Sequence, residues 1–120
     1  MYTFSFERLE VWNKSRMLTK KIYVLTKNYP EDEKFGIVSQ LRRAVISISS
    51  NIAGGSSRKS KKDQAHFYNL AYSSLMETLN QHIISNDLDF IDSQSLIESR
   101  QEIHTISMMI NGLCRSMVNK

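Results

Sequence analysis

Residues 38–52 read VSQLRRAVISISSNI, and this stretch decides the fold. Its apolar residues recur at alternating steps of three and four, at Val38, Leu41, Val45, Ile48 and Ile52. This spacing places them on one side of an α-helix. The β-branched residues among them would also suit a strand, but a strand long enough to hold the whole pattern would be unusual. The spacing therefore predicts a helix from about residue 33 to residue 53.

Two neighbouring stretches show the same kind of pattern. The first runs from about residue 7 to residue 28 and ends before Pro30, because the residue before a proline is pushed out of the helical region. The predicted helix of residues 33–53 is followed by Gly54-Gly55, a common way to end a helix. A further helix is expected after Ser60, which forms a capping arrangement with Asp63, and it runs to about residue 85.

A fourth helix is predicted from Asp92 or Ser93 towards the C-terminus, since either residue can cap it. With only one Pro and four Gly in 120 residues, the chain favours a few long elements over many turns. Four amphipathic helices joined by short loops must pack their apolar stripes together. The sequence therefore predicts an all-α protein, an antiparallel up-down-up-down four-helix bundle that forms a single domain over residues 1–120.

The location of the protein is expected to be cytoplasmic, with no membrane partner. No apolar run approaches the ~18–20 residues that a membrane span needs. The first twelve residues carry Glu7 and Glu10 and lack the apolar core of a signal peptide. The single cysteine, Cys114, excludes an intramolecular disulfide and lies in an apolar helical pattern, so it is expected to be a small buried hydrophobe.

Residues that could carry chemistry are sparse. His66, His82 and His104 do not pair at the spacing that puts two metal ligands on one helical face. The serines lack a nucleophile-elbow setting, and no second carboxylate accompanies Glu77 for acid–base work. We therefore expect a protein that is not an enzyme and that has no metal site and no cofactor.

Charge is distributed unevenly along the chain, whose formal net charge is +4. Residues 1–62 hold 13 Lys and Arg against 5 Asp and Glu, whereas residues 63–120 hold 3 against 7. This asymmetry indicates either a polyanionic partner or self-association between oppositely charged surfaces, and it does not choose between them.

Basic residues form three groups that could contact nucleic-acid phosphates, each contact making binding dependent on salt. The candidates are Arg16, Lys20 and Lys27 on one face of the first helix, Arg42 and Arg43 beside the apolar pattern of residues 38–52, and Arg58, Lys59, Lys61 and Lys62 around a flexible loop. Solvated helix faces carry the same residue types. Only Tyr23 places a ring within the first group, so the sequence shows no stacking platform for single strands.

A patch of small polar residues is predicted on the second helix, where steps of three or four place Arg43, Ser47, Ser50, Asn51 and Gly54 on one face. Such residues let another helix approach closely. Arg42 or Arg43 could then meet Glu77 in a partly buried charged pair. Removing one partner of such a pair strongly destabilises the folded protein, because the other charge is left buried and unpaired. We expect Arg43, Ser47, Asn51 and Glu77 to fix the register of the bundle or of its subunits.

Residues 35–55, FGIVSQLRRAVISISSNIAGG, resemble the central motif of the four-helix-bundle proteins encoded in intervening sequences of the 23S ribosomal RNA gene. The family motif reads FGL-x-x-QLRRA-x-x-S-x-PSNIAEG. Further matches are Leu9 to Trp12, Ile22-Tyr23, Thr26, Tyr29-Pro30, Arg58, Ser60, Ala71, Ser74, Leu75 and Glu77. The resemblance covers roughly residues 4–91. Ser49, Gly54 and Ser73 depart from the family's proline, glutamate and glycine.

This resemblance implies an up-down four-helix bundle that assembles into a homopentameric ring. The family is also similar to the accessory proteins of diversity-generating retroelements, which bind nucleic acid and a reverse transcriptase. By that similarity, the three basic groups are candidate nucleic-acid contacts.

We therefore expect a ring-forming bundle that binds RNA or DNA through backbone phosphates, with little sequence preference. The alternative is a protein-interaction scaffold or accessory subunit that docks a partner protein.

Overall fold

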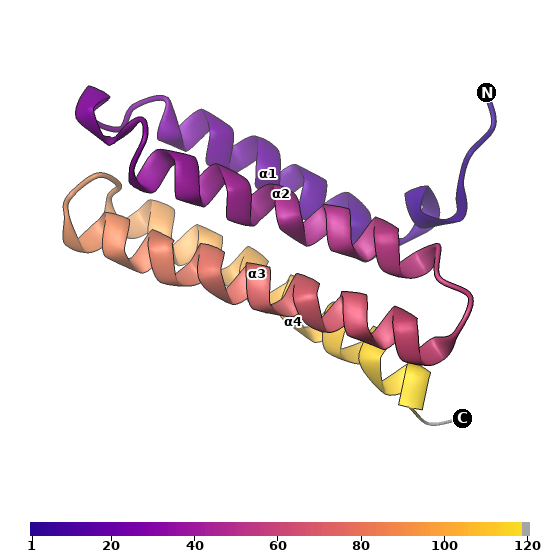
Figure 1. The fold of residues 1–120 in the computed structure, drawn as a ribbon. Helices are drawn as coiled ribbons and strands as arrows, with labels where there is room; N and C mark the ends of the chain where they lie inside the picture. The colour runs from indigo at the N-terminus through magenta and orange to yellow at the C-terminus, as the bar shows by residue number, and fades with distance from the viewer. Residues whose placement is uncertain (119–120) are drawn as a thin grey trace.

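The computed structural model describes residues 1–118 and contains four long helices. They are α1 (Glu10–Thr26), α2 (Ile37–Ser56), α3 (Lys61–Asp87) and α4 (Ser93–Val118) (Figure 1). Short 3-10 helices precede α1 and α2, at Ser5–Arg8 (η1) and Glu31–Glu33 (η2). The described part of the chain contains no strand, and residues 45–52, where a strand was the alternative, lie in the middle of α2.

Successive helices run in opposite directions along the bundle, as the colour gradient of Figure 1 shows. Each helix contacts two others, so that α1 lies against α2 and α4, and α3 lies against the same two helices. The predicted all-α, antiparallel four-helix bundle is confirmed. None of the helices within residues 1–118 has the length and apolar character needed to cross a membrane.

The core is built from the predicted stripes. All five apolar residues of the 38–52 pattern are buried, and Leu41, Val45, Ile48 and Ile52 have no exposed surface. They pack in one cluster with residues of the other three helices, including Leu18, Ile22, Leu75, Ile103 and Ile110. Burial of apolar surface on this scale is the main stabilising term for a bundle of this size.

Two predicted helix caps are present. The Ser60 hydroxyl accepts a hydrogen bond of 3.1 Å from the backbone N–H of Asp63 at the start of α3. At the start of α4, the Asp92 carboxylate accepts one of 2.8 Å from the backbone N–H of Ser95. This second bond stabilises the charged carboxylate and so lowers the pKa of Asp92.

The prediction that Gly54-Gly55 ends the second helix is wrong, because α2 continues through both glycines to Ser56. Gly55 is buried where α2 crosses α3, and a Cβ atom placed on it would lie 2.7 Å from Cε1 of Tyr68 and 3.0 Å from Cβ of Phe67. The glycine is therefore needed for close helix packing rather than for helix termination. The helix also begins later than predicted, at Ile37, because residues 31–33 form η2.

Adjacent glycines should respond in opposite ways to alanine. We expect Gly55→Ala to lower the free energy of unfolding by about 1–3 kcal/mol, since the added methyl group forces α2 and α3 apart. Gly54→Ala is the matched control, because its Cβ would meet Phe67 at 3.5 Å, an ordinary contact. That change should raise the free energy of unfolding by up to about 0.5–1 kcal/mol through helix propensity. Urea denaturation checks both, and equal effects of the two substitutions would contradict the close contact.

Candidate nucleic-acid interface

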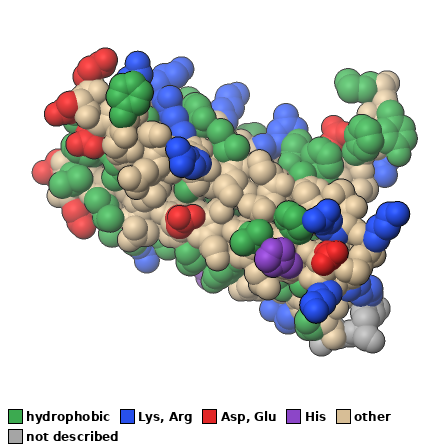
Figure 2. Space-filling model, in the orientation of Figure 1, with side chains coloured by type: hydrophobic (Ala, Val, Ile, Leu, Met, Phe, Trp, Pro, Cys, Tyr) green, Lys and Arg blue, Asp and Glu red, His purple; other side chains and the backbone are tan. Residues whose placement is uncertain are grey.

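Charge is separated along the axis of the bundle. Because the helices are antiparallel, η1, the α2–α3 loop and the end of α4 lie at one end, and η2 and the α3–α4 turn lie at the other (Figure 1). The first end, here called the basic end, carries Arg8, Arg58, Lys59, Lys61, Lys62 and Arg115. The second, the acidic end, carries Glu31, Asp32, Glu33, Asp87, Asp89 and Asp92. Figure 2 shows the acidic side chains gathered mainly at the left, whereas basic side chains lie at the right and also along the upper edge.

A few residues of the opposite sign lie at each end. Glu7 and Asp63 lie at the basic end, where Glu7 bonds the backbone of Phe4 and Asp63 takes part in the cap of α3. Lys27 and Lys34 lie at the acidic end. The separation between the two ends differs from the asymmetry between the two halves of the sequence, because Glu31, Asp32 and Glu33 of the acidic end come from the basic half.

Residues 57–62, here called the basic loop, bring together the third group of predicted contacts. Arg58, Lys59, Lys61 and Lys62 are all exposed. The Arg58 guanidinium lies 4.6 Å from the centre of the Phe67 ring, and the Arg58 carbonyl accepts a hydrogen bond from the Gln64 side chain. Both contacts hold the loop against the first turns of α3.

Two of the three lysines of the basic loop lie where positive charge is unfavourable. Lys61 and Lys62 are the first two residues of α3, next to the positive end of the helix dipole. A lysine there opposes the dipole, whereas an anion or a carboxylate would be stabilised by it. The positions of these side chains therefore cost the fold some stability and create a strongly positive surface that an anion would relieve.

Arg16, Lys20 and Lys27, the first group of predicted contacts, are all exposed. The Arg16 guanidinium lies 4.9 Å from the centre of the Trp12 ring. The structure separates the members of this group, since Lys27 follows the end of α1 and lies at the acidic end. Arg16 and Lys20 lie within α1 itself, Arg16 in the half of the helix nearer to the basic end and Lys20 in the half nearer to the acidic end.

The two arginines of α2 have different roles. Arg42 is half-buried over the Tyr23 ring at 4.4 Å, and its Nε donates a 3.0 Å hydrogen bond to the Thr26 hydroxyl. A second guanidinium nitrogen, Nη2, reaches the Tyr23 carbonyl. Arg42 therefore joins α2 to α1 and has few donors free for a phosphate. Arg43 is exposed.

The predicted polar patch lies between α2 and α3. The Ser74 hydroxyl donates a 2.9 Å hydrogen bond to the Ser47 hydroxyl, which also accepts one from the Asn51 side chain. Arg43 and Glu77 line a hollow of about 430 Å³ beside this network. The expected buried charged pair is not formed, because Glu77 is exposed and residues 1–118 contain no salt bridge from it to Arg42 or Arg43.

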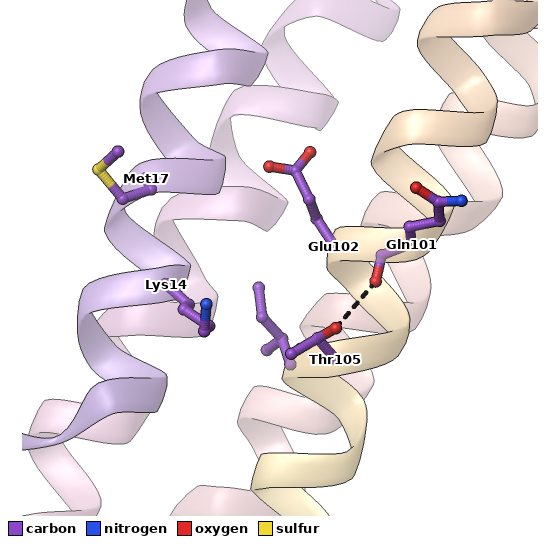
Figure 3. Close-up of a pocket in the computed structure, with 6 residues that line it drawn as sticks. Lys14, Met17, Gln101, Glu102 and Thr105 are labelled. Carbon is purple, nitrogen blue, oxygen red and sulfur yellow. Dashed lines mark hydrogen bonds between the residues drawn. The ribbon is translucent and has the colours of Figure 1, made fainter.

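A second hollow, of about 350 Å³, opens between α1 and α4 (Figure 3). Lys14 and Met17 line it from α1, and Gln101, Glu102 and Thr105 line it from α4. The hydrogen bond drawn in Figure 3 is internal to α4, from the Thr105 hydroxyl to the Gln101 carbonyl.

The two helices that flank this hollow are joined by salt bridges of Lys21. Its ammonium lies 2.6 Å from Glu102 and 3.8 Å from Glu98. The seam between α1 and α4 thus relies on charge as well as on apolar packing.

Histidine and cysteine side chains do not assemble into a reactive centre. His66 and His104 are exposed, and residues 1–118 contain no group of three His, Cys, Asp or Glu side chains that could hold a metal ion. Cys114 is half-buried rather than buried, with its sulfur 3.5 Å from the Asn69 side chain. Burial raises the pKa of this thiol, which disfavours the reactive thiolate.

His82 is the one histidine inside the core. It has no exposed surface, and neither ring nitrogen has a hydrogen-bond partner among the described residues. Burial, and secondly the positive charge of Lys21, lowers the pKa of His82 to about 4. The imidazole is therefore neutral at physiological pH, and a buried polar ring without partners costs stability.

Sequence reasoning overlooked the aromatic residues of the N-terminus. Tyr2 and Phe4 are exposed in an extended segment before η1, and Phe6 packs edge-on against Trp12 at 4.9 Å. The signal was present in the sequence as rings at every second residue, Tyr2, Phe4 and Phe6, ahead of the first helical pattern.

These features define a class of protein, an antiparallel helical bundle with a basic end, an acidic end and no metal-binding cluster within residues 1–118. The chain belongs to the family of 23S rRNA-intervening sequence proteins, whose sequence model matches residues 7–112. The resemblance found in the sequence is thereby confirmed.

Among solved structures, the fold is similar to the crystal structure of a protein of unknown function from the S23 ribosomal protein family of Bacteroides thetaiotaomicron. The two chains are 20% identical, with a TM-score of 0.61 over 91% of this chain and 95% of that one. At this identity the similarity shows the fold alone. No curated protein matches the chain.

The buried histidine gives a prediction for the pH dependence of stability. Its pKa in the folded protein is below that of the unfolded chain, so its neutral form stabilises the fold above about pH 6.5, and this contribution is lost as pH falls towards 4. We expect the loss to reach about 3 kcal/mol.

The control for this prediction is His82→Leu, which replaces the ring by an apolar side chain. The variant should be at least as stable as the wild type at pH 7. Its free energy of unfolding should fall less than that of the wild type between pH 7 and pH 4, because it has no buried imidazole to protonate. Urea denaturation between pH 4 and 7 measures the difference between the two proteins. Parallel stability curves for wild type and variant would contradict the assignment.

Proposed function

We propose that this chain is a non-enzymatic, cytoplasmic bundle that assembles into a homo-oligomeric ring, a pentamer, and binds RNA or DNA through backbone phosphates. The observation that carries the proposal is the basic loop, with four exposed cations within five residues at the positive end of α3. Membership of a family encoded within a ribosomal RNA gene is consistent with an RNA ligand.

Phosphate contact fits the chemistry of this surface better than base recognition in a groove. The cations lie in a short loop and on the first turn of a helix. Contacts of this kind hold the nucleic-acid backbone without reading the sequence. The expected ligand is therefore any accessible phosphate backbone, bound with strong dependence on salt.

Self-association is supported by apolar side chains on the outer surface of α2 and α3. Ile46, Leu70 and Ile84 are each about two-fifths exposed, on the same two helices that the hydrogen bond between Ser47 and Ser74 joins. We therefore place the subunit contact at the polar patch between α2 and α3. Arg43 and Glu77 line the hollow beside this patch and do not pair within one chain, so they can pair between two chains. A ring of subunits would repeat the basic end around one axis.

Size-exclusion chromatography with light scattering tests both parts of the proposal, with and without a generic RNA and at low and high salt. A pentamer-sized particle that gains mass with RNA at low salt and loses it at high salt is the expected result. A particle of that size that ignores RNA at both salts would overturn nucleic-acid binding and favour the protein-interaction scaffold.

Replacing the two lysines at the start of α3 should move stability and binding in opposite directions. We expect Lys61→Glu with Lys62→Glu to raise the free energy of unfolding by about 1 kcal/mol, because carboxylates suit the positive end of a helix. The same variant should bind RNA at least about tenfold more weakly at low salt, since cationic contacts become repulsive. Thermal unfolding and fluorescence anisotropy measure the two effects.

A matched control makes the same change of charge at the acidic end, Lys27→Glu with Lys34→Glu. This variant has the same net charge as the first and should retain most of the affinity. An equal loss of binding in both variants would show that affinity follows net charge and not the basic loop.

A further inference from the structure

The N-terminal arm, residues 1–4, is an aromatic segment held away from the bundle. Tyr2 is 75% exposed and Phe4 is 60% exposed, and in Figure 1 the arm leaves the bundle at the basic end. Figure 2 shows its apolar side chains standing clear of the helices. Side chains of this kind are normally buried, so an exposed pair on a projecting segment marks a contact surface.

The base of the arm is fixed, so the direction of the arm is defined. The Phe4 backbone N–H donates a 2.9 Å hydrogen bond to the Glu7 carboxylate, and the Glu7 N–H donates to the Phe4 carbonyl. The Asn13 side chain donates to the carbonyls of Glu7 and Leu9, which ties η1 to α1. The packing of Phe6 against Trp12 completes the anchor.

The two exposed rings form a pair that leaves aromatic faces free. Tyr2 and Phe4 meet edge to face, with their centres 4.9 Å apart and their planes at 80°. In this geometry the edge of one ring covers a single face of the other, so the remaining faces stay open to solvent. Open aromatic faces beside cations are the ordinary receptor for unpaired bases.

We infer that the arm is a stacking platform for the bases of single-stranded nucleic acid, with Tyr2 and Phe4 taking bases while Arg8 and the basic loop hold the phosphates. The inference rests on the proposed function and adds to it a preference for single-stranded over double-stranded nucleic acid. Bases inside a duplex are stacked on each other and cannot reach the rings, whereas every base of a single strand offers a free face.

Charge favours this ligand over a protein partner. The arm lies at the end of the bundle where positive charge gathers, and the exposed cation Arg8 follows within four residues of Phe4. Two arginines contact aromatic rings near the same end, Arg16 the Trp12 ring of α1 and Arg58 of the basic loop the Phe67 ring of α3. The acidic end offers a comparison, since Phe35 is 89% exposed there but follows the three carboxylates of η2, with Lys34 as the cation over its ring.

The test is fluorescence anisotropy of the full chain with a labelled oligouridylate and a labelled RNA duplex, each of about 20 units. Oligouridylate is chosen because its bases stack weakly on each other. The double variant Tyr2→Ala with Phe4→Ala should bind the single strand at least about tenfold more weakly than the wild type and should bind the duplex equally well. The conservative exchange Tyr2→Phe with Phe4→Tyr should restore single-strand binding.

Phe35→Ala is the matched control, because it removes an equally exposed ring from the acidic end and should leave both affinities unchanged. The basic-loop variant Lys61→Glu with Lys62→Glu should weaken both probes, so failure of the phosphate contacts is distinguishable from failure of the arm. Unchanged single-strand binding by the Tyr2/Phe4 double variant would overturn the inference and leave the proposed function intact.

Two other results would also overturn the inference. A smaller particle for the arm variant in light scattering, with RNA affinity per subunit unchanged, would make the arm a contact between protein chains. Failure of the wild type to bind either probe at low salt would remove the proposed function and the stacking platform together.

Discussion

The backbone of α2 at Gly55 lies against Tyr68 and Phe67 of α3 with no room for a side chain, and the placement of the basic loop depends on this contact. The loop begins two residues later, and Phe67 also supports the guanidinium of Arg58. The hydrogen bond between Ser47 and Ser74 fixes the same two helices further along. Close packing between α2 and α3 therefore holds these two helices against each other and positions the basic loop that joins them.

Because the helices are antiparallel, the charged loops lie at opposite ends of the bundle, and the two ends differ in charge. Each loop joins neighbouring helices at one end only, so a basic α2–α3 loop and an acidic α3–α4 turn must lie at opposite ends. The field of such a molecule attracts polyanions to one end and repels them from the other. In the proposed function, this arrangement would orient a nucleic-acid backbone before any contact forms, with the aromatic arm at the end that the backbone approaches.

Much of the fold could be predicted from the sequence because a helix that buries one face must repeat apolar residues at steps of three and four. The five apolar residues of the 38–52 pattern show this repeat without interruption, and all five are buried. The caps at Ser60 and Asp92 were predictable because they involve neighbours three residues apart. Gly55 was misinterpreted because glycine serves both helix ends and close helix contacts, and only the position of Tyr68 distinguishes them.

Prediction of the candidate site was less complete, because its contacts join distant residues. Arg42 folds back onto Tyr23 and Thr26 of another helix, so its proximity to Arg43 in sequence does not make the two equivalent. The arm was overlooked because helical periodicity begins only after it, and its rings follow a step of two.

The proposed function requires that the basic end binds nucleic acid by neutralising phosphates. The most direct test is the affinity of the wild-type chain for a DNA duplex over a series of salt concentrations, because the slope of log affinity against log salt counts the phosphates neutralised. Contact with the four cations of the basic loop predicts a slope of about −3 to −4. A slope near zero, or no binding at low salt, would contradict the account.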